Sequence, residues 1–175
     1  MTFAVILLGG LFASHADACT GISLTAQDGS QVVARTVEWA ATPMQCGYVV
    51  APRGHQHQSY TPTGENGLKY SAAYGYVGIY TEYEPFVVEG VNESGLSAGL
   101  FFFPQYGEYA PYDSADNAKT LCDMQFVSWV LSQFSTIDEA TLPVPRCCAG
   151  SAHPMPPCLT AWSTAAFTSW AASLC

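Results

Sequence analysis

Cys19 directly follows the tripeptide Ala16-Asp17-Ala18, and this placement is the clearest chemical signal in the chain. Ala16 and Ala18 give the small-x-small pattern that a signal peptidase cuts, behind an apolar segment over residues 3–13. Cleavage after Ala18 would make Cys19 the first residue of the mature protein. An α-amine has a pKa of about 7.7–8.0, so such a cysteine carries a base that can take its thiol proton. The pattern therefore predicts a signal peptide over residues 1–18 and an N-terminal cysteine nucleophile.

Two other interpretations of Cys19 stay open at this point. It could be a buried strand cysteine, with the cleavage site elsewhere. It could also be a lipoprotein cysteine, although the position three before it is Ala16 rather than a larger aliphatic residue. The alternative function is then an exported, non-enzymatic binding protein, lipid-anchored at Cys19 or stapled by disulfides.

Composition excludes several classes of protein. The chain has 175 residues, a formal net charge of −9 and only five Lys and Arg, so we expect no nucleic-acid partner. The apolar segment is too short to span a bilayer. Export would place the protein in the periplasm or outside the cell, where disulfides form. The seven cysteines include no C-x-x-C pair, and we expect neither a metal site nor a cofactor.

Alternating and β-rich segments dominate the first hundred residues. Asp28-Gly29 is a hairpin turn signal between strands predicted at 21–25 and 31–37, and this hairpin would bring Cys19 close to Arg35. A second turn, at residues 93–95, separates two further strands. The other predicted segments are strands at 47–52, 68–80 (one or two strands), 86–92 and 96–103, with loops at 53–67 and 104–118.

Helical spacing first occurs near residue 124 and predicts a helix over 120–133. Residues 136–139 form a capping box, but Pro143 and Pro145 follow, so we expect no second helix. Residues 141–175 hold four of the seven cysteines and five of the eleven prolines. We interpret this tail as a divergent Cys/Pro-rich segment, frameshifted or otherwise aberrant; the alternative is a genuine Cys-rich appendage.

Three segments carry a resemblance to a known family. They are residues 19–21 (CTG), residues 34–39 (ARTVEW) and residues 89–101 (EGVNESGLSAGLF). In this order and spacing they resemble the choloylglycine hydrolase family, which includes bile salt hydrolases and penicillin V acylases. Residues 48–54 (YVVAPRG) and 124–134 are also similar to it, and the leader with the R-T-x-E-W form resembles its Gram-negative branch. The resemblance covers residues 19–140.

The resemblance implies an α/β (α+β) protein with the αββα sandwich of N-terminal nucleophile hydrolases, here apparently truncated. It implies that Cys19 attacks a linear amide, that Arg35 lies beside the thiol and favours the thiolate, and that Glu38 holds the α-ammonium or orients Arg35. Asn92 is an oxyanion or a structural candidate. Phe101 is an oxyanion candidate through its backbone N–H.

The chain also departs from the family pattern. It contains no Asn-Ser-Pro segment for a second oxyanion asparagine, and its last asparagine is Asn117. We therefore expect that this chain could be inactive as it stands. The expected substrate is a small amide with a bulky apolar acyl group, and bile salts, penicillin V and acyl-homoserine lactones all stay open. The family resemblance implies homo-oligomers for full-length relatives.

Overall fold

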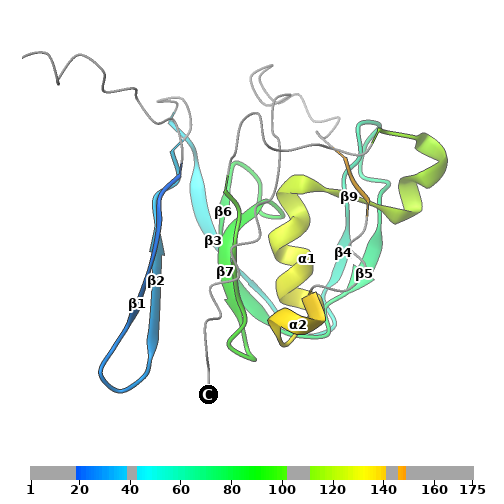
Figure 1. Ribbon diagram of the computed structural model, residues 1–175. Coiled ribbons are helices and arrows are strands. Elements are labelled where there is room, and N and C mark those ends of the chain that lie inside the picture. The colour runs from blue at the N-terminus through cyan, green and yellow to red at the C-terminus, as the bar shows by residue number, and fades with distance from the viewer. Residues whose placement is uncertain (1–18, 39–42, 102–110, 141–145, 149–175) are drawn as a thin grey trace, which may run out of the picture.

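The computed structural model describes residues 19–38, 43–101 and 111–140, together with the backbone of residues 146–148. The predicted signal peptide, most of the predicted tail and part of the predicted strand 96–103 lie outside the described residues. The described residues form one four-stranded sheet and three two-stranded sheets, and helix α1 (Phe126–Gln133) packs on the four-stranded sheet (Figure 1).

The predicted first hairpin is confirmed. Strand β1 (Gly21–Thr25) pairs antiparallel with strand β2 (Gln31–Arg35), and Gly21 lies opposite Arg35. The turn is closed by Asp28, whose carboxylate accepts the Ser30 N–H at 2.9 Å and the Ser30 hydroxyl at 2.6 Å. Gly29 has a φ of 85°, a backbone conformation that glycine adopts without a steric penalty.

The centre of the fold is a four-stranded antiparallel sheet with the order β3-β6-β7-β8. Its strands, β3 (Cys46–Ala51), β6 (Tyr76–Thr81), β7 (Val87–Asn92) and β8 (Ser97–Gly99), confirm predicted β segments. The long segment predicted at 68–80 divides into β6 and a strand outside this sheet, β5 (Lys69–Ser71).

Helix α1 covers one face of this sheet and completes the hydrophobic core. Val130 and Leu131 are fully buried against the sheet, together with Val87 of β7. The approach to β7 is close, because a Cβ added at Gly90 would lie only 2.7 Å from Cδ1 of Leu131. Glycine at this position therefore sets how near the helix can come to the sheet.

A second, smaller lobe packs beside the helix. Strand β4 (Gln56–Gln58) pairs with β5, and β9 (Thr120–Cys122) pairs in parallel with β10 (Arg146–Cys148). The buried side chains of Ser59 and Gln125 join these pieces. The Ser59 hydroxyl donates to Oε1 of Gln125 at 3.1 Å and accepts the Cys122 N–H at 2.7 Å, so these buried polar groups are paired.

The helix predicted over 120–133 is wrong in its first half. Residues 120–122 form β9, and a 3-10 turn η3 (Asp123–Gln125) then leads into α1. The cause is tertiary: these three residues are fully buried and take part in a parallel strand pair with β10, a partner that helical spacing cannot reveal. Strand β4 was likewise missed within the predicted loop 53–67, because its three residues are polar.

Two short helices also differ from expectation. The predicted loop 104–118 contains a 3-10 helix η2 (Ser114–Lys119), capped by the Asp113 side chain. The capping box at 136–139 does open a helix, α2 (Ile137–Ala140), in which the Thr136 hydroxyl accepts the Glu139 N–H at 3.3 Å. The expectation of no second helix is therefore corrected to a single turn, ending close to where the prolines begin.

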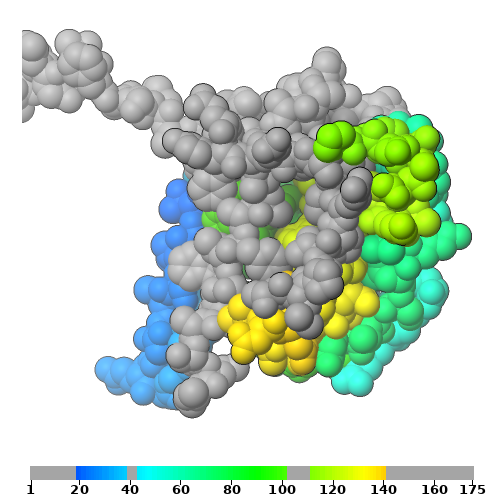
Figure 2. All heavy atoms as spheres, turned by 45° about the vertical axis from the view of Figure 1, so that its right-hand side comes forward, coloured from blue at the N-terminus to red at the C-terminus, as the bar shows by residue number. Residues whose placement is uncertain are grey.

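The layers stand in the order helix, sheet, hairpin. In Figure 1, α1 lies on one side of the four-stranded sheet and the β1–β2 hairpin lies on the other side. The space-filling view likewise places the hairpin (blue) at one edge of the molecule and residues 111–140 (lime to yellow) toward the other (Figure 2). This arrangement is part of the predicted αββα sandwich.

Candidate active site

Cys19 lies at the open end of the β1–β2 hairpin, on the same face as Arg35. Pairing continues one step beyond the strands, because the Thr36 N–H donates to the Thr20 carbonyl at 2.9 Å. Cys19 is two residues before Gly21, which lies opposite Arg35, so the two side chains are diagonal neighbours. The thiol is half-buried, and its Sγ lies 3.9 Å from the Glu38 carbonyl oxygen, to which it can donate weakly.

Arg35 is anchored to the main sheet rather than facing solvent. Its Nη1 donates to the carbonyl oxygens of Val88 at 2.9 Å and Leu100 at 2.6 Å, residues that lie on two adjacent chain segments of the sheet. The guanidinium carbon also lies 4.5 Å from the centre of the Phe101 ring, within the range of a cation–π contact. These contacts fix a positive charge on the face of the hairpin that carries the Cys19 side chain.

Glu38 is tied to the Cys19 end of the hairpin through Thr36. The Thr36 hydroxyl donates to Oε1 of Glu38 at 2.7 Å and accepts the backbone N–H of Thr20 at 3.1 Å. Among the described residues, no hydrogen bond or ion pair joins the Glu38 carboxylate to Arg35. The structure thus connects Glu38 to the peptide that follows Cys19, and orientation of Arg35 falls to the carbonyls of Val88 and Leu100 instead.

Glu89 adds a second acidic group near Arg35. Burial raises the pKa of its carboxyl, while the nearby Arg35 charge opposes that rise. Its carboxylate occupies the space beside Gly99, where any Cβ would collide with Oε2 of Glu89. The sequence analysis did not single out Glu89, and only its position on the Arg35 side of the sheet identifies it.

The side-chain amide of Asn92 stabilises the turn between β7 and β8. Its Oδ1 accepts the N–H groups of Ser94 and Leu96, both at 3.0 Å. Its Nδ2 donates to the carbonyls of Leu131 at 2.9 Å and Phe134 at 2.7 Å, which lie at the end of α1. Every hydrogen-bonding position of the amide is therefore occupied by the fold.

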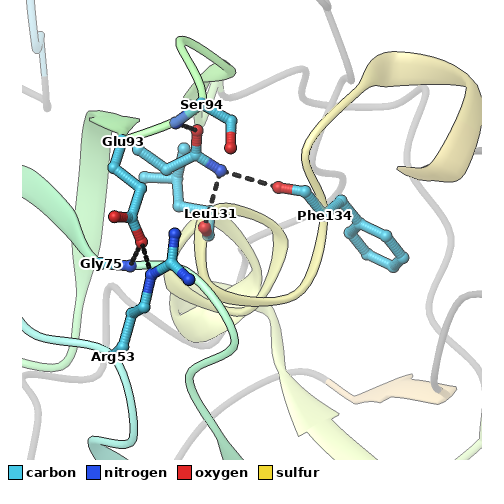
Figure 3. Close-up of polar contacts among 7 residues, drawn as sticks. Arg53, Gly75, Glu93, Ser94, Leu131 and Phe134 are labelled. Atoms are coloured by element: carbon cyan, nitrogen blue, oxygen red, sulfur yellow. Dashed lines mark hydrogen bonds and ion pairs between the residues drawn. The ribbon is translucent and has the colours of Figure 1, made fainter.

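Figure 3 shows a second set of hydrogen bonds beside the same turn. Oε1 of Glu93 accepts the Gly75 N–H and the Arg53 Nε–H, both at 2.6 Å. These bonds join the start of β6 to the β7–β8 turn. Together with the Asn92 contacts, they make this corner a structural joint between the sheet and the helix.

The site residues predicted from sequence thus fall into two groups. Cys19 and Glu38 are in contact at the open end of the hairpin, and Arg35 of the same hairpin contacts Phe101, while no described contact joins Asn92 to them. Thr36 was missed, although its i, i+2 spacing to Glu38 on an extended strand places the two side chains on one face.

Other features bear on the range of chemistry available here. Within the described ranges, no three His, Cys, Asp or Glu side chains come together as a metal site, and no helix is long and apolar enough to cross a membrane. Cys46 is a second free thiol and is exposed.

Comparisons with protein families and with curated proteins agree on one family. Residues 19–144 match the model for linear amide C–N hydrolases of the choloylglycine hydrolase family. A bile salt hydrolase/transferase of Clostridium perfringens (strain 13 / Type A) is 29% identical over 121 residues, which are 69% of this chain and 36% of that protein.

Two solved structures of the conjugated bile acid hydrolase from Clostridium perfringens share the fold. A cysteine-to-alanine mutant matches with a TM-score of 0.58 and 22% identity, over 74% of this chain and 39% of that one. An arginine-to-leucine variant matches with a TM-score of 0.53 and 22% identity, over 69% and 35% respectively. The chain thus spans little more than a third of the length of these relatives, and over the segment that it shares with them it belongs to the choloylglycine hydrolase family of linear amide C–N hydrolases.

Proposed function

We propose that this protein hydrolyses linear amides with Cys19 as an N-terminal nucleophile. The observation that carries the proposal is the placement of Cys19 and Arg35 as diagonal neighbours at the open end of the hairpin. The cysteine and the arginine substituted in the two solved bile acid hydrolases are sixteen positions apart, as Cys19 and Arg35 are here. The family match supports the same class of reaction.

The reaction follows from the groups present. The Cys19 sulfur attacks the amide carbonyl carbon, its thiol proton passes to the α-amine, and a tetrahedral oxyanion forms. Collapse breaks the C–N bond, and the α-ammonium returns the proton to the leaving amine. The resulting thioester is hydrolysed by water, which yields the carboxylic acid and restores the thiol.

Arg35 and Phe101 give this site its electrostatic character. The two carbonyl bonds and the ring contact hold the guanidinium in place, so its charge is oriented before any substrate binds. A fixed cation beside a thiol stabilises the thiolate during attack. We assign Glu38 to the α-ammonium and the Phe101 N–H to the oxyanion, as the family resemblance implies.

The proposed substrate pairs a bulky apolar acyl group with a polar amine, in the manner of conjugated bile salts or penicillin V. Relatives of this chain act on bile salts by name, which favours that class. We further propose that residues 1–18 are removed during export to the periplasm or the medium, so that Cys19 gains its free amine. A homo-oligomeric state is part of the same proposal.

The assay uses single-turnover conditions, because one equivalent of released amine then reports acylation of Cys19 directly.

The test compares the exported wild type with Cys19→Ala at stoichiometric protein concentration. We expect wild type to release about one equivalent of glycine from glycocholate, and Cys19→Ala to release none, because the thioester cannot form. Cys46→Ala, which changes an exposed thiol, is the matched control and should release the same amount as wild type. Equal release by wild type and Cys19→Ala would refute the proposal, as would a diacylglyceryl group on Cys19, which blocks both thiol and amine.

A further inference from the structure

The backbone hydrogen bonding of the β1–β2 hairpin departs from the regular antiparallel pattern at the residue pair nearest Cys19. Two residues that form a hydrogen-bonded antiparallel pair normally exchange both N–H···O=C bonds. In the pair of Thr20 and Thr36 only one of these bonds is made, from the Thr36 N–H to the Thr20 carbonyl at 2.9 Å. The second is replaced, because the Thr20 N–H donates to the Thr36 hydroxyl at 3.1 Å.

The carbonyl and the hydroxyl of Thr36 therefore bind different partners. The carbonyl accepts Nε–H of Arg35 at 3.2 Å. The hydroxyl accepts the Thr20 N–H with a lone pair and donates its single proton to the Glu38 carboxylate at 2.7 Å. A side chain lacking this oxygen could make neither contact.

We propose that Thr36 is a positioning residue for Cys19, whose hydroxyl ties the Cys19–Thr20 peptide to the carboxylate of Glu38. The proposal rests on the proposed function of Cys19 as the nucleophile. The Thr20 N–H belongs to the peptide that follows Cys19, so fixing it fixes the frame from which the α-amine and the thiol project. The bond to Glu38 holds the carboxylate at the same end of the hairpin, where Sγ of Cys19 already lies 3.9 Å from the Glu38 carbonyl.

The chemistry explains why a hydroxyl is needed rather than a methyl group. Thr36 is exposed, so its value lies in these directed bonds and not in apolar burial. Proton transfer between the thiol and the amine of Cys19 requires the two groups to keep a defined geometry, and displacements of about 1 Å are costly in such sites. Thr36→Val keeps the shape of the side chain and removes the hydroxyl, whereas Thr36→Ser keeps the hydroxyl.

The experiment measures the reactivity of the Cys19 thiol in the exported chain that begins at Cys19. Iodoacetamide is added to the native protein at neutral pH, and labelling of the Cys19 peptide is followed by mass spectrometry. We expect Thr36→Val to slow labelling by about threefold or more and Thr36→Ser to stay within about 1.5-fold of wild type, since only the former disturbs the amine–thiol geometry. The matched control is Thr25→Val, at the far end of the same hairpin, where the lost hydroxyl donates to the Gln31 side chain at 3.0 Å.

If Thr36 only supported the strand, the labelling rate of Cys19 would follow the stability of each variant. Valine suits a strand at least as well as serine, so melting temperatures should not place Thr36→Val below Thr36→Ser. Should Thr36→Val fail to fold, Glu38→Leu gives a second measure, because it removes the acceptor of the Thr36 hydroxyl, with Glu38→Gln, which keeps an acceptor, as its control. We expect slower labelling of Cys19 in Glu38→Leu than in Glu38→Gln.

The outcomes separate this inference from the proposed function. Labelling of Thr36→Val at the wild-type rate, or equal slowing in Thr36→Val and Thr36→Ser, would overturn the role of Thr36. If wild-type Cys19 is labelled no faster than the exposed Cys46, the proposed function itself fails, whatever the variants do.

Discussion

The two faces of the four-stranded sheet differ sharply. On the α1 face, Val87, Val130 and Leu131 are fully buried, and Phe86 is 1% exposed in the same core. On the opposite face, which borders the Cys19 hairpin, large apolar side chains stay open to solvent. These exposed residues are Tyr48, Val50, Val77, Ile79 and Val91 on the sheet, with Ile22, Leu24 and Val32 on the hairpin.

This contrast separates what holds the fold from what makes the chemistry. The helix face has glycine at the point of closest approach, buried hydrogen bonds and a continuous core. The hairpin face has the proposed nucleophile Cys19, the anchored Arg35 cation and few buried contacts. Arg35 links the two regions, because its bonds cross from the hairpin to the sheet.

Shortening one apolar side chain on each face should change the free energy of unfolding by very different amounts. Leu131→Ala on the helix face should cost about 2–5 kcal/mol in the free energy of unfolding, because a fully buried side chain leaves a cavity. Val50→Ala on the open face, where the residue is 67% exposed, should change it by less than about 0.5 kcal/mol. Urea unfolding measures both. Similar costs for the two variants would show that the open face is covered in solution.

Asn92→Ala tests the joint between the sheet and α1. The change removes four hydrogen bonds and leaves buried backbone groups unpaired, so we expect a loss of about 2–4 kcal/mol. Asn117→Ala, at a half-buried asparagine on η2 whose amide bonds to the side chains of Tyr112 and Thr63, is the control and should cost clearly less. A small effect at position 92 would mean that the turn does not depend on its amide, and would return Asn92 to the list of residues available for catalysis.

Acid should weaken the half of the protein that carries α1. His57 stacks on Tyr70 at 4.8 Å and on Tyr76 at 6.1 Å, meets the His55 ring edge-on, and its Nε2 has no hydrogen-bond partner among the described residues. Burial, with a smaller contribution from His55, lowers the pKa of His57 to about 4. The unfolded chain therefore binds the proton more tightly, and stability falls as the pH drops from about 6.5 toward 4.

The partial burial of His57 limits how much stability is lost, and a variant of its neighbour His55 serves as the control. We expect His57 to contribute about 2 kcal/mol to the loss over that range, after a discount for solvent screening. His57→Phe keeps the aromatic stack and should remove this part of the pH dependence, whereas His55→Phe, at an exposed position, should largely keep it. An unchanged pH dependence in His57→Phe would assign the acid sensitivity to other groups.

The smallest expected effect is at the surface ion pair of Arg53 and Glu93. Its side chains are 66% and 40% exposed, so the pair should contribute less than about 1 kcal/mol. Glu93→Gln retains an acceptor for the Gly75 N–H and should change the melting temperature only slightly, with a difference that diminishes in high salt. A loss comparable with Asn92→Ala would show that this carboxylate is a principal support of the corner.

Local signals in the sequence account for the features that were predicted correctly. The Asp28-Gly29 turn fixes the register of the first hairpin, which in turn places Cys19 near Arg35. The parallel pair of β9 and β10 could not be found in this way, because its partners are distant in sequence and carry no alternating pattern.

The same limit applies to the site. The residues that hold Arg35 are 53 and 65 positions away from it, and they contribute backbone carbonyls that no side-chain motif can reveal. The Thr36–Glu38 contact is local and could have been found from strand periodicity alone. The motif identified which residues to examine, whereas the folded chain was needed to show what positions them.

The most direct test of the account is to trap the acyl group on Cys19. The protein, recovered after the proposed export step, is incubated with a phenoxyacetyl amide, quenched in acid and digested, and its peptides are analysed by mass spectrometry. We expect a phenoxyacetyl thioester, removable by hydroxylamine, on a peptide whose first residue is Cys19. An acyl group on any other residue, no acyl group after prolonged incubation, or a mature chain that begins elsewhere would contradict it.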